Sequence, residues 1–126
     1  YHINQGNRPI DKKMFHFHSA IRELSYSLRR AEPRGKKSIL LPLLYTKIGD
    51  AYVGLGDKVK AETYYRKSIV KVPQHSSAYK RLVTLLIRSS RYKEAKIIND
   101  QGLQLFKKNK FFRRKEPSIE KVLKIE

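Results

Sequence analysis

Residues 42–75 read PLLYTKIGDAYVGLGDKVKAETYYRKSIVKVPQH, and this stretch decides the fold of the chain. Apolar residues recur at helical spacing on both sides of its Gly56-Asp57 pair. They are Leu44, Ile48, Tyr52 and Leu55 before the pair, and Ala61, Tyr65, Ile69 and Val72 after it. Glycine adopts the left-handed conformation that ends a helix, and aspartate caps the next one. The stretch predicts two short helices that face each other across a tight turn, with Pro73 ending the second.

Small, aromatic and turn-forming residues occupy fixed positions of this stretch. They are Tyr45, Ile48, Gly49, Tyr52, Gly56, Ala61, Tyr65, Ser68 and Pro73. The pattern resembles the tetratricopeptide repeat, a helix-turn-helix unit of about 34 residues. Ser68 and Tyr45 stand where that family usually has alanine and tryptophan. The resemblance implies an all-α fold in which helix-turn-helix repeats form a right-handed superhelix.

Residues 76–109 repeat the pattern in the same register. Apolar residues recur 34 positions after those of the first unit, at Tyr79, Leu82, Leu86 and Ala95. The residue types of the first unit are not kept at four equivalent positions, which hold Val83, Ser90, Asn99 and Lys107. We therefore interpret 42–75 as one repeat and 76–109 as a degenerate second one, with helices near 43–55, 59–72, 77–89 and 92–106. The alternative, two unrelated hairpins, is disfavoured by the shared register.

The segments before the repeats are predicted to extend the core. Residues 1–10 are polar and indicate an irregular start, and residues 11–41 hold a helix capped by Asp11 and then a basic linker at 32–38. One apolar stripe runs along that helix at Met14, Phe17, Ile21, Leu24 and Leu28, and it is expected to pack against the first repeat helix. Ala20, Leu24 and Ser27 resemble the second helix of a repeat, which favours a diverged preceding repeat with a longer loop over the alternative of a chance similarity.

Residues 110–126 complete the chain with a basic-aromatic segment and a C-terminal helix. Ser118, just after Pro117, is the expected cap of that helix, in which Ile119, Val122 and Leu123 share one face. Repeat arrays need a terminal element with a polar outer side for solubility. This helix is therefore predicted to cap the second repeat, and the alternative is that it extends toward another chain.

The charge of the chain is its most unusual property of composition. It holds 29 Lys+Arg against 11 Asp+Glu in 126 residues, a formal net charge of +18. Such a surplus favours acidic partners, whether protein segments, nucleic acid or anionic lipid. The seven-residue apolar run at 39–45 is too short to span a membrane. A soluble, intracellular protein is favoured, and the missing initial methionine indicates a fragment or a processed form.

The residues offer no catalytic or cofactor-binding constellation. The chain has no cysteine and four histidines, His2, His16, His18 and His75, none of them with a partner at metal-ligand spacing. The glycines follow no phosphate-binding pattern. We therefore expect a protein without enzymatic activity, cofactor or metal.

The resemblance implies a concave groove that is lined by the first helix of each repeat and receives a segment of a partner protein. The positions that would line it hold Leu43, Thr46, Asp50, Val53, Lys80, Thr84, Ile87 and Arg88. Thr46 and Asp50 replace the lysine and asparagine with which one subclass clamps a terminal carboxylate, so such a clamp is disfavoured. An apolar strip at Val53 and Ile87 with basic flanks suits an acidic or amphipathic segment.

A second candidate surface is the basic segment KKNKFFRRK at 107–115. Its cations are Lys107, Lys108, Lys110, Arg113, Arg114 and Lys115. Basic residues around Phe111 and Phe112 can neutralise phosphates while a ring stacks on a base, but the same rings can simply anchor the segment on the core. The leading hypothesis is an adaptor or scaffold within a larger assembly that binds a protein segment, and the alternative is an RNA- or ribonucleoprotein-associated protein.

Overall fold

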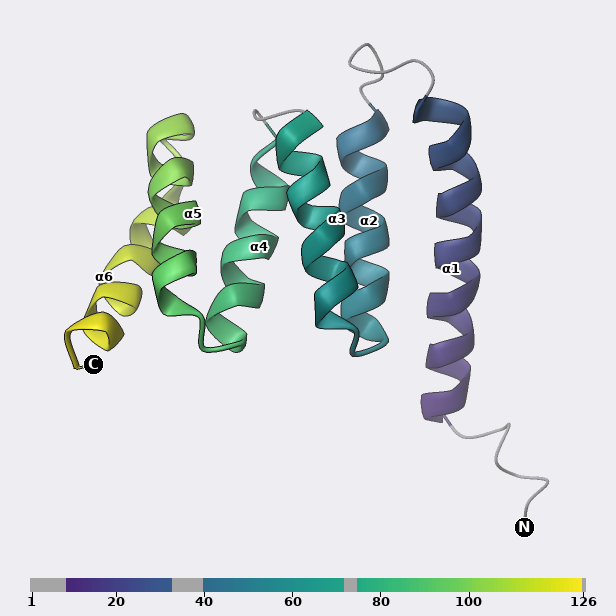
Figure 1. The fold of residues 1–126 in the computed structure, drawn as a ribbon, viewed down its shortest axis with the longest axis horizontal. Helices are drawn as coiled ribbons and strands as arrows, with labels where there is room; N and C mark the ends of the chain where they lie inside the picture. Colours follow the sequence, from purple (N-terminus) through teal and green to yellow (C-terminus); the bar gives the residue numbers. More distant parts are fainter. Residues whose placement is uncertain (1–8, 33–39, 72–74, 126) are drawn as a thin grey trace.

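A computed structural model describes residues 9–32, 40–71 and 75–125, and every regular element within these ranges is an α-helix. The helices are α1 (Pro9–Ala31), α2 (Leu40–Gly54), α3 (Lys58–Lys71), α4 (Ser76–Arg88), α5 (Tyr92–Leu105) and α6 (Lys110–Ile125). They stand in a row in chain order, with α1 at one end and α6 at the other (Figure 1). Three expectations lie wholly or largely outside the described residues: the irregular start predicted at 1–10, the linker predicted at 32–38 and the role of Pro73.

Packing follows the order of the chain. Each helix contacts the next one, and weaker contacts join α2 to α4 and α4 to α6. The helices α2 and α3 form the first predicted hairpin, and α4 and α5 form the second. The predicted all-α repeat architecture is confirmed.

The two hairpins turn in the same way although their sequences differ. Gly56 has a φ of +82° between α2 and α3, and Ser90 has a φ of 59° at the equivalent place between α4 and α5. Asp57 caps α3 as predicted, because its Oδ1 accepts a hydrogen bond of 3.1 Å from the backbone N–H of Lys60. The left-handed conformation is therefore kept in the second turn even without glycine, at some cost in strain.

Small residues let α2 and α3 approach closely. A Cβ atom built on Gly49 would lie 2.5 Å from Cε1 of Tyr65, a distance that real Cβ contacts do not show. Ala61 on α3 is fully buried beside them. In the second hairpin, Val83 and Asn99 stand at the positions equivalent to Gly49 and Tyr65, and both are buried. Of each pair, the larger side chain is therefore on the second helix in the first hairpin (Tyr65) and on the first helix in the second hairpin (Val83).

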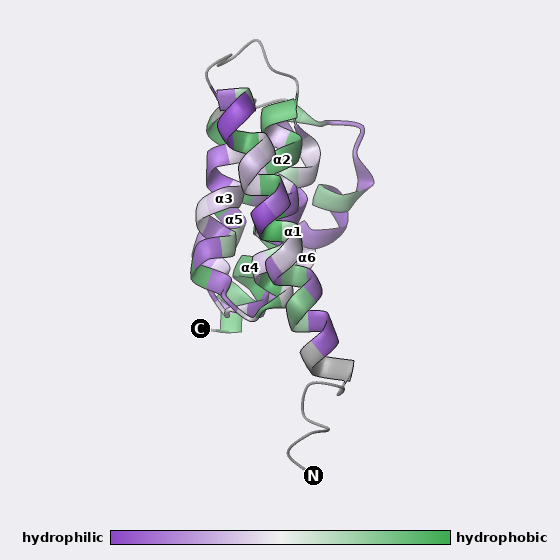
Figure 2. Cartoon of the chain, turned by 90° about the vertical axis from the view of Figure 1, so that its right-hand side faces the viewer, coloured by the Kyte–Doolittle hydropathy of each residue, from purple (hydrophilic) through white to green (hydrophobic). Residues whose placement is uncertain are grey.

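Helix α1 begins at Pro9, so the prediction that Asp11 caps it is wrong. Proline is favoured at the first position of a helix because its missing N–H would be unpaired there anyway. The predicted stripe does face α2, since Leu28 belongs to a buried cluster with α2 residues and the ring of Phe17 lies against Gly54. Seen from the α1 end, hydrophilic and hydrophobic residues alternate in bands along the helices, as burial of one face requires (Figure 2).

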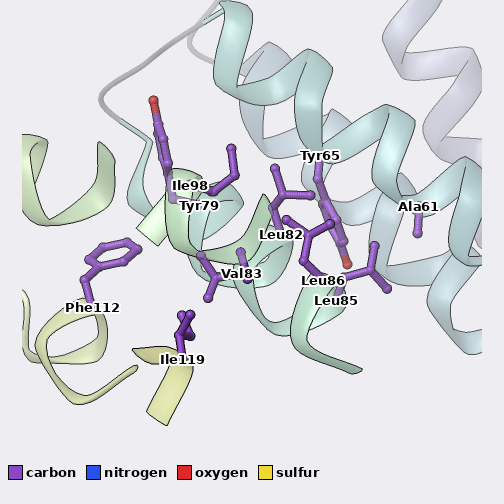
Figure 3. Packing of buried hydrophobic residues seen from close by; sticks show 11 residues of the cluster. Ala61, Tyr65, Tyr79, Leu82, Val83, Leu85, Leu86, Ile98, Phe112 and Ile119 are labelled. Atoms are coloured by element: carbon purple, nitrogen blue, oxygen red, sulfur yellow. The ribbon is translucent and has the colours of Figure 1, made fainter. Parts of the chain in front are cut away.

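Helix α6 starts at Lys110, so the prediction of a helix starting at Ser118 is wrong. Asn109 caps it, because its Oδ1 accepts a 3.0 Å hydrogen bond from the N–H of Phe111. Phe112 and Ile119 are buried in one cluster with residues of α4, toward which they project in Figure 3. The two side chains are seven residues apart and therefore share one helix face, and their packing keeps α6 continuous through Pro117.

Ion pairs between α3 and the start of α5 tie the two hairpins together. Arg91, at the N-cap of α5, donates hydrogen bonds to Glu62 of α3 and to Glu94 of α5, and Arg66 adds a 2.9 Å bond to Glu62. The hydrogen bonds from Arg91, and then those from Arg66, lower the pKa of Glu62 below its ordinary value of 4.5 despite partial burial. Such a carboxylate stabilises the folded state only while it is ionised.

The change Glu62→Gln is expected to lower the free energy of unfolding by about 1 kcal/mol at pH 7. The pKa of Glu62 is lower in the folded state than in the unfolded state. Its contribution to the free energy of unfolding is therefore fully present above about pH 4.5 and is lost as the pH falls through the folded-state pKa. Urea unfolding of both proteins at pH 7 and pH 3 measures the difference. A difference of equal size at both pH values would contradict this assignment.

Candidate functional site

A pocket of about 370 Å³ opens between α2 and α4, and we call it the α2–α4 pocket. Five of the eight predicted groove residues meet in it: Asp50, Val53, Lys80, Thr84 and Arg88. The structure adds four residues that the sequence argument missed, which are Lys58, Tyr65, Arg81 and Leu85. Lys58 and Tyr65 belong to α3. The prediction considered only positions in the first helix of each repeat, so it could not include them.

The other three predicted groove residues lie elsewhere. Thr46 is only 2% exposed, and its hydroxyl donates to the carbonyl of Pro42 at 2.7 Å and lies 3.2 Å from the hydroxyl of Ser68. The prediction that Thr46 faces a ligand is therefore wrong. Leu43 is exposed but lies outside the pocket, and Ile87 packs against the core.

The single carboxylate of the α2–α4 pocket is already occupied by hydrogen bonds. Nε of Arg81 lies 2.7 and 2.9 Å from the two oxygens of Asp50, and the hydroxyl of Tyr65 donates to one of them. Burial, and then the bond to Asp50, raise the pKa of Tyr65 far above its ordinary value, so Tyr65 remains a donor. The charge of Asp50 is thus balanced within the protein.

The remaining charges of the α2–α4 pocket are positive. Lys58, Lys80 and Arg88 line it without forming an ion pair among the described residues. Leu85 is almost fully buried and Val53 is half-buried, so they supply apolar surface between the cations. Such a site can hold an apolar side chain with carboxylates on either side of it.

A second pocket, of about 380 Å³, lies between α4 and α6, and we call it the α4–α6 pocket. Half of the predicted basic surface meets there, namely Lys110, Arg114 and Lys115, together with Lys80, Asn109, Phe111 and Ser118. Lys80 lines both pockets, so they adjoin each other. The groove and the basic segment, which the sequence suggested as two separate sites, are neighbours on one surface.

The other half of the predicted basic surface does not join the α4–α6 pocket. Lys107 and Lys108 are exposed, and Arg113 donates a 2.6 Å hydrogen bond to the carbonyl of Lys107. Phe112 is fully buried, so it anchors α6 and cannot stack on a base. Phe111 is half-buried, and Nζ of Lys115 lies 5.5 Å from its ring centre. Of the two rings that could stack on an RNA base under the alternative hypothesis, Phe112 is therefore excluded and Phe111 is left.

The described ranges contain neither a metal-binding cluster nor a helix that could span a membrane. Residues 9–32, 40–71 and 75–125 contain no cluster of three His, Cys, Asp or Glu side chains that could hold a metal ion. In the same ranges, no helix has both the length and the apolar character needed to cross a membrane.

This chain is similar to known proteins in its structure, and no match is found for its sequence. No protein-family model and no curated protein matches the sequence. The first TPR domain of Spaghetti (RPAP3), solved with the HSP90 peptide SRMEEVD, superposes with a TM-score of 0.69 at 21% identity, over 85% of this chain and 81% of that one. The Sgt2 TPR domain of Aspergillus fumigatus superposes with a TM-score of 0.61 at 20% identity, over 93% of this chain and 81% of that one.

Proposed function

Because this chain has the fold of tetratricopeptide-repeat domains, we propose that it is a non-catalytic adaptor that binds an acidic segment of a partner protein in the α2–α4 pocket. The observation that carries the proposal is the composition of this pocket. Its apolar floor lies among three cations, while its one carboxylate is bound by Arg81 and Tyr65. A segment with acidic residues on both sides of an apolar residue would complement the apolar surface and the surrounding cations of this pocket.

One of the two structural neighbours supports a peptide as the ligand. The RPAP3 domain binds SRMEEVD, a peptide with a methionine and a valine among its three acidic residues. That pattern has the alternation of apolar and acidic groups that the α2–α4 pocket would accept. The net charge of +18 adds attraction at longer range, which raises association rates with acidic partners.

The proposal is tested with labelled SRMEEVD and its neutral analogue SRMQQVN, whose binding is followed by fluorescence anisotropy at physiological salt. We expect the acidic peptide to bind about tenfold more tightly than the neutral one. Replacing Lys58 and Arg88 with glutamine should remove most of this preference, since both cations line the pocket.

The matched control removes the same charge elsewhere, through Lys93→Gln and Lys121→Gln, because both lysines are exposed and lie outside the α2–α4 pocket. This control variant should keep the preference for the acidic peptide. Equal losses in the two variants would mean that the whole basic surface attracts the peptide. The α2–α4 pocket would then not be its binding site.

A further inference from the structure

We propose that the α4–α6 pocket is a second anion site, which accepts the phosphoryl group of a phosphorylated serine or threonine in the same partner segment. This inference rests on the proposed function and adds to it a modification that the partner would carry. Three observations support it: the register of α6, the free charges of the pocket and the anchoring of its helix.

The register shows that α6 continues the ligand-facing pattern of α4. Lys80, Arg81 and Thr84 are followed 34 residues later by Arg114, Lys115 and Ser118. Each triplet is a pair of adjacent cations followed by a hydroxyl residue, which neighbours both cations on the helix surface because it lies three and four residues after them. All three α4 residues line the α2–α4 pocket, and all three α6 residues line the α4–α6 pocket. Helix α6 therefore lines a further stretch of the groove as well as capping the array.

The charges of the two pockets differ in one respect. The α2–α4 pocket contains Asp50, whereas no acidic residue lines the α4–α6 pocket. Its four cations, Lys80, Lys110, Arg114 and Lys115, form no ion pair with any residue that the structure describes. The hydroxyl of Ser118 adds a further donor at the same place. The pocket thus offers several hydrogen-bond donors and an excess of positive charge.

This set of groups fits a phosphoryl group better than a single carboxylate. A phosphomonoester carries nearly two negative charges at pH 7 and has three strong acceptor oxygens, which guanidinium and ammonium groups bind together. A carboxylate would leave most of the four cations unbalanced. The N-terminus of α6 is capped by Asn109, so the side chains would provide the binding.

The donors are held on a well-anchored helix. Phe112 and Ile119 bury one face of α6, and Nδ2 of Asn99 on α5 donates a 2.9 Å hydrogen bond to the carbonyl of Phe112. Arg114 and Lys115 follow directly after this anchor. Because Lys80 lines both pockets, a segment bound in the α2–α4 pocket can continue into the α4–α6 pocket without leaving the surface.

The experiment compares extended forms of SRMEEVD by fluorescence anisotropy at physiological salt. A phosphoserine is attached through two glycines to the amino end of the peptide or, in a second probe, to its carboxyl end, and each probe is paired with its serine form. We expect one of the phosphorylated probes to bind about tenfold more tightly than its serine partner. The variant Lys110→Gln/Arg114→Gln/Lys115→Gln should abolish this gain, while still binding the serine form in the α2–α4 pocket.

The matched control is Lys108→Gln/Lys121→Gln/Lys124→Gln, three exposed lysines outside both pockets, with far-UV circular dichroism confirming that each variant stays folded. If the serine forms bind and phosphorylation adds nothing, or the control loses as much of the gain, this inference is overturned and the proposed function stands. If the serine forms do not bind, the proposed function fails first. If a uridine oligonucleotide binds more tightly than every peptide and loses affinity only in the pocket variant, the site is one for nucleic acid, and the inference is overturned.

Discussion

Replacing Phe112 with alanine is expected to lower the free energy of unfolding by about 3–5 kcal/mol. Phe112 is fully buried at the junction of α5 and α6, where its ring centre lies 5.9 Å from that of Phe106 and 5.3 Å from that of Phe111. Gly102 leaves room for the ring, because a Cβ atom there would lie 2.4 Å from it. Gly102 has no side chain that could fill the cavity from its side, so much of the lost contact energy is not recovered.

Urea unfolding followed by circular dichroism measures this effect. Phe15→Ala is the control, because that ring is 67% exposed on α1 and its removal should change the free energy of unfolding by less than about 0.5 kcal/mol. Undocking of α6 would also remove the α4–α6 pocket, so the Phe112 variant should lose any gain from phosphorylation. A loss of stability below about 1 kcal/mol would show that α6 is not anchored by this ring.

Gly49→Val is expected to cost about 2–3 kcal/mol, because the added atoms meet a ring that cannot turn away. Tyr65 is 2% exposed and its hydroxyl donates a hydrogen bond to Asp50, so a shift of the ring would break this bond between α2 and α3. Moving the ring also changes the α2–α4 pocket, of which Tyr65 is a wall. Peptide binding is therefore expected to weaken along with stability.

The second repeat suggests the compensating change for this variant. There, Val83 and Asn99 occupy the two equivalent positions. The double variant Gly49→Val/Tyr65→Asn should be more stable than the sum of its single changes predicts, by about 1 kcal/mol or more. Thermal and urea unfolding of all four proteins gives the coupling energy. Simple additivity would show that Gly49 and Tyr65 do not share one space.

The repeat fold was predictable because its signals are local. Glycine at 56, aspartate at 57 and the apolar spacing of 42–72 depend on backbone conformation and on one helix face, both of which can be read without knowing the neighbours. The start of α6 was missed for the opposite reason. Pro117 disfavours a helix interior locally, and only the packing of Phe112 and Ile119 on the preceding helices overrides it.

The candidate site was predictable in outline, but its hydrogen bonds were not. Family positions located Asp50, Val53 and Arg88 in one pocket. They failed for Thr46, because Ser68 stands where the family usually has alanine and its hydroxyl pairs with that of Thr46 between α2 and α3. The position of Lys80 between two pockets depends on how α6 stacks against α4, which no single repeat encodes.

The succession of contacts along the row of helices has a consequence for how the chain folds. Since each helix packs mainly on its immediate neighbour in sequence, native contacts close short loops and little chain entropy is spent before they form. Stability is then close to a sum of helix-to-helix interfaces, so opening can begin at either end and leave the centre intact. Helix α1, which packs mainly on α2, forms one of these two ends, and α6 forms the other. The α2–α4 pocket lies between these ends, in the part of the array where opening costs most.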